Sequence, residues 1–170
     1  MSIKLVNQPR VESILDREGL DGLVVVNPIN FYYFSGYWGF FNTPTGFDGS
    51  YFSVLPRDSD KKPSMVIPAL EIRRIETKGR PWIKDIFSYT SDGDGSSFDD
   101  NSPKGMDYEG WPINQTAKLT QREKNWKKIV EDFKDSYNEN SFQALVRAIK
   151  SSHLDGKKIL IDDLRIERWL

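Results

Sequence analysis

Few side chains in this sequence are of the types that bind metals or act as nucleophiles. The chain contains no cysteine and one histidine, His153. The lack of cysteine rules out disulfides, thiolate metal sites and a thiol nucleophile. His153 follows an apolar helical stretch, where its cationic form meets the negative helix end favourably; with no second histidine, a metal or triad role is disfavoured. The glycine patterns of phosphate-binding loops are also absent from the sequence.

A polar segment over residues 91–118 contains a pattern that resembles a cation-binding loop. Its acidic residues begin at Asp92 and continue to Asp100. In a calcium-binding loop counted from Asp92, the sixth residue is glycine and the twelfth glutamate, but this chain has Ser97 and Pro103. Both replacements break the geometry of such a loop. We interpret residues 91–118 as a long polar surface excursion within the domain.

The segment over residues 37–47, called here the aromatic segment, is the stronger candidate for a functional surface. Its glycines and proline are typical of a loop, yet its large aromatic rings are unfavourable to leave in water. Such rings either cover the core of their own domain or press against another surface. We expect this segment to wall a substrate entrance or to fill an interface. The candidate residues are Tyr37, Trp38, Phe40, Phe41 and Phe47.

The charge and apolar patterning exclude several classes of partner. The chain has 170 residues, with 24 Lys and Arg against 25 Asp and Glu, and a formal net charge of −1. This balance disfavours a dedicated nucleic-acid-binding protein, which usually carries a basic excess. No stretch approaches the ~20 apolar residues that span a bilayer, and the N-terminus lacks the apolar run of a secretory signal. We expect one cytoplasmic domain, covering residues 1–170, with no nucleic-acid or membrane partner.

The apolar pattern predicts the scaffold of these segments as an α/β fold, with a mixed, mainly parallel sheet flanked by helices. A helix capped by Asn7 and ended by Gly19 precedes a strand over residues 22–26 that is apolar on both faces, as in parallel sheets covered by helices. Pro28 then opens a short helix that ends at residues 35–36. Further strands are expected over residues 51–56, 64–67, 86–89 and 159–161. Further helices are expected over residues 68–79, 121–137 and 142–149.

Two features near the C-terminal end add to this prediction. Thr120 and Glu123 form a capping box at the start of a helix, and residues 138–140 interrupt the helical register after Tyr137. The last residues, 164–170, begin an amphipathic turn at which the sequence stops, without a helix stop signal. We therefore expect the chain to be a fragment, with a catalytic metal-binding domain downstream.

Four segments occur in an informative order: Leu20–Val25, Asn27–Gly36, Val66–Glu71 and Gly156–Asp163. The second is the most specific, and its motif positions are Asn27, Pro28, Asn30, Tyr33, Ser35 and Gly36. From about residue 9 to residue 170, this succession resembles the N-terminal domain of the creatinase/Xaa-Pro aminopeptidase (prolidase) family, whose catalytic half has the "pita-bread" metallopeptidase fold. Taken alone, the motif favours an architectural role, with a share in a pocket at the carboxyl end of the first strand as the alternative.

The resemblance implies a creatinase N-terminal domain-like fold with a ribonuclease H-like motif, a homodimeric parent protein, and a peptide or small amide substrate. Family members hold two divalent metal ions with two Asp, one His and two Glu of the catalytic half, and no counterpart of that set is present here. The chain alone is therefore expected to be non-catalytic. In creatinase, the region of the aromatic segment offers a cation to the substrate carboxylate of the partner subunit. This segment has no Arg or Lys, which disfavours a creatine-like substrate.

The leading hypothesis is a non-catalytic N-terminal domain of an Xaa-Pro aminopeptidase- or dipeptidase-like metallo-hydrolase. Its role would be to support dimerisation and to limit access to a two-metal site, where a metal-bound hydroxide attacks the Xaa-Pro amide. One alternative is the same domain in a creatinase-like amidinohydrolase. A second is a free-standing α/β module that binds a small ligand or a protein. A third is a family member that has lost its metal ligands.

Overall fold

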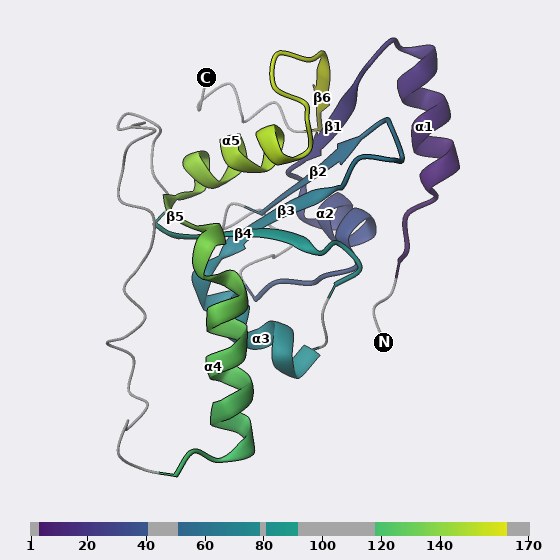
Figure 1. Cartoon of the computed structure of the whole chain (residues 1–170). Coiled ribbons are helices and arrows are strands. Elements are labelled where there is room, and N and C mark those ends of the chain that lie inside the picture. The colour runs from purple at the N-terminus through teal and green to yellow at the C-terminus, as the bar shows by residue number, and fades with distance from the viewer. Residues whose placement is uncertain (1–3, 41–50, 79–80, 92–117, 163–170) are drawn as a thin grey trace.

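A computed structural model of the chain describes residues 4–40, 51–78, 81–91 and 118–162 (Figure 1). The strands are β1 (Gly22–Val25), β2 (Phe52–Pro56), β3 (Ser64–Pro68), β4 (Asp85–Ser91), β5 (Tyr137–Asn140) and β6 (Ile159–Ile161). They form one sheet in the order β5-β4-β3-β2-β1-β6. Strand β2 runs antiparallel to both of its neighbours, whereas the other three pairings are parallel. The predicted mixed, mainly parallel sheet is confirmed.

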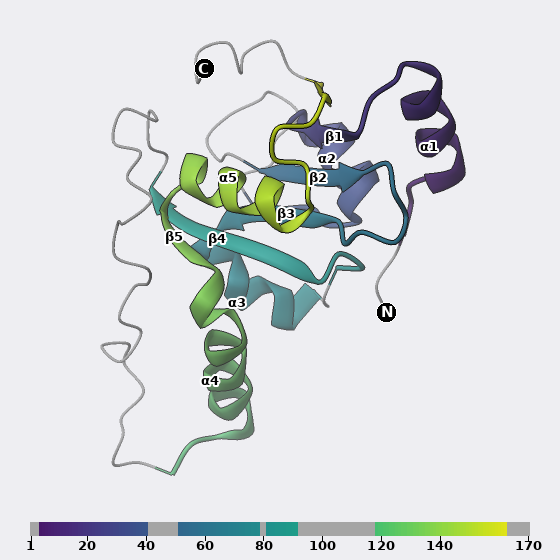
Figure 2. The same ribbon diagram turned by 45° about the horizontal axis from the view of Figure 1, so that its top comes forward.

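Helices cover both faces of this sheet (Figures 1 and 2). They are α1 (Gln8–Arg17), α2 (Pro28–Ser35), α3 (Ala69–Lys78), α4 (Gln121–Phe133) and α5 (Ser141–Ser151), with a short 3₁₀ helix η2 (Lys134–Ser136). Helices α1 to α4 share one apolar cluster with one sheet face, which includes Leu23 and Val25. Helix α5 forms the opposite cluster, which includes Val24. Leu23, Val24 and Val25 all belong to β1, which is apolar throughout because both faces of this strand are covered.

Most of the predicted helix boundaries are confirmed by their capping contacts. The Asn7 side chain accepts a hydrogen bond from the first turn of α1, and Thr120 and Glu123 form the predicted capping box of α4. Gly19 and Gly36 follow α1 and α2 with φ values of 61° and 68°, in the left-handed region that glycine favours. None of the described helices combines the length and the apolar character that crossing a bilayer requires.

The region after α4 corrects the prediction. The helix ends at Phe133 rather than Tyr137, and Tyr137 instead begins β5, in register with Ser88 of β4. The interruption expected at residues 138–140 is a strand, which the sequence hid because it lacks the β-branched residues typical of strands. Contacts with β4 override this weak propensity, since Asn138 Nδ2 donates to the Ser88 carbonyl oxygen at 3.1 Å.

Some predictions concern residues outside the described ranges. They include nearly all of the polar excursion over residues 91–118, with its comparison to a calcium loop. They also include the turn over residues 164–170, and Phe41 and Phe47 of the aromatic segment. These interpretations stay predictions.

Candidate functional site

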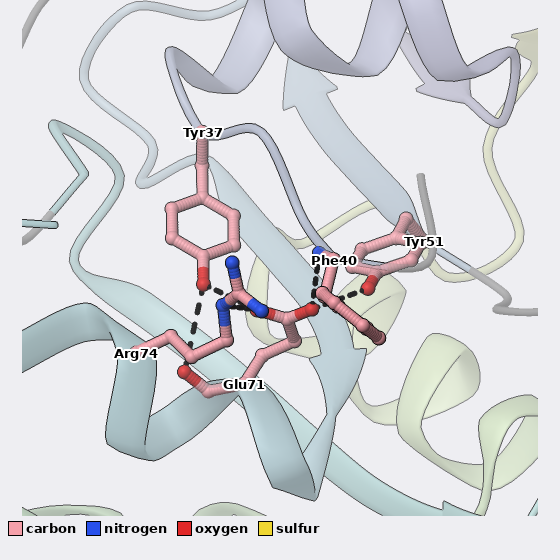
Figure 3. Close-up of polar contacts among 5 residues, drawn as sticks. All are labelled: Tyr37, Phe40, Tyr51, Glu71 and Arg74. Carbon is pink, nitrogen blue, oxygen red and sulfur yellow. Dashed lines mark hydrogen bonds and ion pairs between the residues drawn. The ribbon is translucent and has the colours of Figure 1, made fainter. Parts of the chain in front are cut away.

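The candidate site is built around the buried carboxylate of Glu71 (Figure 3). Strand β3 ends at Pro68 and α3 begins at the next residue, so Glu71 lies in the first turn of the helix. It stands four residues before the buried Ile75 and therefore on the same, inward side of α3. Its side chain is 0% exposed. The positive end of the helix dipole favours a negative charge at this position.

Three donors share the Glu71 carboxylate, and a cation lies beside it. The hydroxyls of Tyr37 and Tyr51 donate to Oε2 and Oε1 respectively, each at 2.7 Å. The backbone N–H of Phe40 also donates to Oε1. Arg74 Nε lies 3.5 Å from Oε2, one turn further along α3. Because an uncompensated buried charge is strongly unfavourable, these partners make the burial of the carboxylate possible.

The Tyr37 hydroxyl is held in its donor form. Burial raises the pKa of Tyr37 far above the ordinary tyrosine value, and the hydrogen bond to Glu71 and the negative charge of Glu71 raise it further. The charge of Arg74 opposes this shift in the pKa but does not cancel it. The hydroxyl therefore remains protonated at physiological pH, and the bond to Glu71 persists.

The carboxylate connects two parts of the chain that flank residues 41–50. Phe40 precedes this stretch and Tyr51 follows it, and both donate to the same oxygen of Glu71. Directly before Phe40 the backbone passes close to the Tyr51 ring, since a Cβ added at Gly39 would lie 2.4 Å from Tyr51 Cε1. The Tyr51 ring has little room to move away from Gly39, because it is buried and packs on Phe31 with a centroid distance of 5.3 Å. Only glycine fits at position 39 without displacing this arrangement.

Above the buried cluster, three aromatic rings reach solvent. Trp38 is 37% exposed and Phe40 is 61% exposed. Tyr32 of α2 meets the Trp38 ring edge-on, with a centroid distance of 5.6 Å. The Arg74 guanidinium lies 4.7 Å from the centroid of the Phe40 ring, within the range of a cation–π contact. We use the name aromatic face for two contacting pairs that neighbour each other in the chain at Trp38 and Phe40: Tyr32 with Trp38, and Phe40 with Arg74.

The predicted entrance or interface residues fall into three groups. Trp38 and Phe40 are exposed and belong to the aromatic face. Tyr37 is buried at 3% exposure and supports this face from inside the domain. Phe41 and Phe47 are outside the described residues. Their roles in an entrance or an interface stay predictions.

The first half of the predicted motif fixes the end of β1 and the start of α2. Asn27 caps α2 by accepting hydrogen bonds from the backbone of its first turn, and Pro28 occupies the first helical position. Asn30 Nδ2 donates to Asp162 Oδ2 at 2.9 Å. Asp162 Oδ1 also accepts from the backbone N–H groups of Val26 and Asn27, at 2.6 and 3.1 Å. These contacts support the architectural interpretation of the motif.

The second half of the motif leads the chain toward the Glu71 cluster. The Tyr33 hydroxyl accepts a hydrogen bond from the backbone N–H of Asn7 at 3.1 Å, which joins α2 to the start of α1. The buried Ser35 hydroxyl accepts from the Tyr37 backbone N–H at 3.0 Å. Gly36, between them, makes the left-handed turn. Tyr37 is thus held at its backbone by Ser35 and at its hydroxyl by Glu71.

Sequence reasoning did not single out Glu71, Tyr51 or Arg74 as site residues. One signal was present for Glu71: a charged residue four positions before Ile75, inside the apolar stripe of a predicted helix. Such a residue is either a break in the stripe or a buried charge with partners. The sequence could not identify those partners, because Tyr37 and Tyr51 approach Glu71 only through the tertiary fold.

The described residues do not form a metal site. Among them, no group of three or more His, Cys, Asp or Glu side chains is placed to hold a metal ion. Glu71 itself is surrounded by hydrogen-bond donors and a guanidinium, which are not metal ligands. We therefore derive no metal chemistry from these residues.

The fold defines the chain as a mixed α/β domain in which one antiparallel strand lies within an otherwise parallel sheet. Residues 9–166 match the family described as Creatinase/Prolidase N-terminal domain, so the chain belongs to this family. This match confirms the resemblance inferred from the sequence. No curated protein matches the chain significantly.

Several solved structures are similar to the chain, and three of them are the following. The Creatinase/Prolidase N-terminal domain of an X-Pro dipeptidase from Streptococcus pyogenes is 19% identical, with a TM-score of 0.37, and the match covers 51% of this chain and 62% of that chain. A proline dipeptidase from Streptococcus agalactiae 2603V is 14% identical, with a TM-score of 0.37 and coverages of 81% and 95%. A Creatine_N superfamily domain of a dipeptidase from Streptococcus thermophilus is 13% identical, with a TM-score of 0.37 and coverages of 88% and 98%. At these values the structures add no argument to the family match.

Proposed function

We propose that this chain is the non-catalytic N-terminal domain of an Xaa-Pro aminopeptidase- or dipeptidase-like metallo-hydrolase. In this proposal the parent protein is a cytoplasmic homodimer, and a separate catalytic domain holds two divalent metal ions. The aromatic face contacts the second subunit and borders the entrance through which peptides reach the metal site. Membership of the Creatinase/Prolidase N-terminal domain family supports the proposal.

The observation that carries the role of the aromatic face is the exposure of Trp38 and Phe40 on a rigid base. Leaving large rings in water is unfavourable, and covering them contributes roughly 25 cal/mol per Å² of apolar surface. The backbone of Phe40 is tied to the buried Glu71, so the rings are presented by the core. Exposed aromatic side chains that are held in place are typical of contact surfaces.

The proposal is tested on the complete product of the gene that encodes this chain. We expect it to hydrolyse Xaa-Pro peptides and to sediment as a dimer. In that protein, Trp38→Ala should raise KM for an Xaa-Pro peptide or lower the dimer fraction, because it removes a ring of the aromatic face. The matched control is Trp126→Ala on α4, which removes a partly buried ring that stacks with Arg122 at 4.9 Å.

The outcomes separate the class of protein from the role of the face. A complete gene product without Xaa-Pro hydrolysis contradicts the proposed class, and a reading frame that stops after residue 170 favours the free-standing binding module instead. Unchanged KM and unchanged mass for Trp38→Ala contradict the role of the aromatic face. An equal effect of Trp126→Ala contradicts it as well.

One contact favours a second candidate, the creatinase-like amidinohydrolase. The aromatic segment has no Arg or Lys of its own, but α3 brings the Arg74 guanidinium to 4.7 Å from the Phe40 ring. A cation is therefore present beside the exposed rings, and a substrate carboxylate would share it with Glu71, to which it is already paired. Hydrolysis of creatine by the complete gene product, in place of Xaa-Pro peptides, would support this candidate.

A further inference from the structure

We infer that Glu71 is the positioning residue of the aromatic face: its buried carboxylate fixes the backbone at Phe40 and the cation above the Phe40 ring. The inference rests on the proposed function for what the aromatic face does. It adds the residue on which the shape of that face depends, and it can be tested without any catalytic activity.

The direction of the hydrogen bonds supports this role of Glu71. A carboxylate offers lone pairs on two oxygens, and hydrogen bonds to a charged group are shorter and stronger than neutral ones. Oε1 of Glu71 receives the Phe40 N–H and the Tyr51 hydroxyl, while Oε2 receives the Tyr37 hydroxyl. Only one of these donors is a backbone group, and it belongs to the residue whose ring is most exposed on the face. Moving Phe40 would break the bond that satisfies its own N–H.

The chain from Tyr37 to Phe40 is also restricted in its conformation. Tyr37 is held at its backbone by the Ser35 hydroxyl and at its phenol by Glu71. Gly39 passes against the Tyr51 ring, which is itself bonded to Glu71. Trp38 lies between these two anchored positions, so the direction in which its side chain leaves the domain follows from theirs.

The carboxylate of Glu71 is also linked to the cation of Arg74. Arg74 Nε lies 3.5 Å from Glu71 Oε2, and the Arg74 guanidinium carbon lies 4.7 Å from the Phe40 ring centroid. Glu71 thus acts on Phe40 twice, through the backbone N–H and through the cation that stacks on the ring. Figure 3 shows the carboxylate between these groups.

The test compares two substitutions of Glu71 in this chain. The carbonyl oxygen of glutamine can accept from Phe40 N–H and the Tyr51 hydroxyl, and its NH₂ can donate to the Tyr37 oxygen, so Glu71→Gln should keep the hydrogen bonds at Phe40 and remove the ion pair with Arg74. Leucine has a similar volume and no acceptor. We expect amide hydrogen exchange at Phe40, measured by NMR, to become faster by roughly tenfold or more in Glu71→Leu and to stay near the wild-type rate in Glu71→Gln.

The Leu145 amide in α5, on the opposite sheet face, reports whether the whole domain has become less stable. Faster exchange at Phe40 with unchanged exchange at Leu145 supports the inference, and equal changes at both amides overturn it. If Glu71→Leu does not fold, Glu71→Asp decides instead, because it keeps the charge but withdraws the carboxylate from Phe40 N–H by one methylene. Unchanged Phe40 exchange in Glu71→Asp then overturns the inference.

A second measurement connects positioning to function in the complete gene product. Glu71→Leu should change KM or dimer fraction in the same direction as Trp38→Ala, with kcat unchanged, and Glu71→Gln, which loses the ion pair with Arg74 but keeps the bond to Phe40 N–H, should have a smaller effect. If Phe40 exchange responds as expected but neither Glu71→Leu nor Trp38→Ala alters KM or mass, the proposed role of the aromatic face fails while the positioning inference stands. If Trp38→Ala alters KM but Phe40 exchange does not respond to Glu71→Leu, the inference alone fails.

Discussion

Asp162 should make a large contribution to the stability of the domain for a residue that is only partly buried. Its side chain joins the end of β6 to the end of β1 and the start of α2. Oδ1 accepts from the backbone N–H groups of Val26 and Asn27, and Oδ2 accepts from Asn30 Nδ2. Replacing Asp162 with alanine leaves two backbone donors and one side-chain amide without this partner.

The magnitude follows from these contacts. Hydrogen bonds to a charged group contribute roughly 1.5–3 kcal/mol to stability. Because Asp162 is only partly buried, water replaces some of the lost contacts, and we expect the free energy of unfolding to fall by about 1.5–2 kcal/mol for Asp162→Ala. In a domain of this size, such a loss lowers Tm by roughly 3–8 °C. Asp162→Asn keeps an acceptor for the backbone amides and should lose less.

Urea unfolding of the wild-type chain and its variants, followed by circular dichroism, measures this difference. The matched control is Asp155→Ala, in the exposed turn between α5 and β6, which removes an aspartate carboxylate from a neighbouring part of the chain. A free energy of unfolding for Asp162→Ala within about 0.5 kcal/mol of the Asp155→Ala value would refute this reasoning.

Two further predictions concern the segment between α2 and the candidate site. Gly36→Ala should lower the free energy of unfolding by roughly 1–2 kcal/mol, because alanine is strained at a φ of 68°. Gly19→Ala, at an exposed turn residue with a φ of 61°, should have a similar effect. No loss of stability at either position would contradict the strain argument. The raised pKa of Tyr37 means that the unfolded chain loses this proton at lower pH than the folded chain, so stability is full below the ordinary tyrosine pKa and falls as the pH rises above it. In Tyr37→Phe the part of this alkaline loss due to Tyr37 should disappear, as measured by urea unfolding at several pH values; an unchanged alkaline loss would contradict it.

Local signals in the sequence were sufficient for most elements of the fold. Asn7, Asn27 and Thr120 are capping residues whose side chains act on the next few backbone groups, so their effect depends on neighbours in the chain. Gly19 and Gly36 end their helices for an equally local reason. The order of the segments carried the resemblance to the family, which the match over residues 9–166 confirms.

The features that the sequence did not predict depend on distant partners. Strand β5 is polar, and it forms because Asn138 and its neighbours pair with β4, about 50 positions earlier in the chain. The Glu71 cluster likewise joins residues 20 to 34 positions apart. A charged residue in an apolar stripe indicates that partners must exist, but only the fold identifies Tyr37, Phe40 and Tyr51.

The pairing of β6 with β1 has a consequence for synthesis of the protein on the ribosome. The flank of β1 that receives β6 stays open until Ile159–Ile161 has been translated, although β1 itself is among the first residues made. Nascent chains that are cut or stalled before this point would present an uncovered strand of apolar residues, which invites pairing with other chains. The domain therefore depends on β6 to cover this flank of β1 during translation.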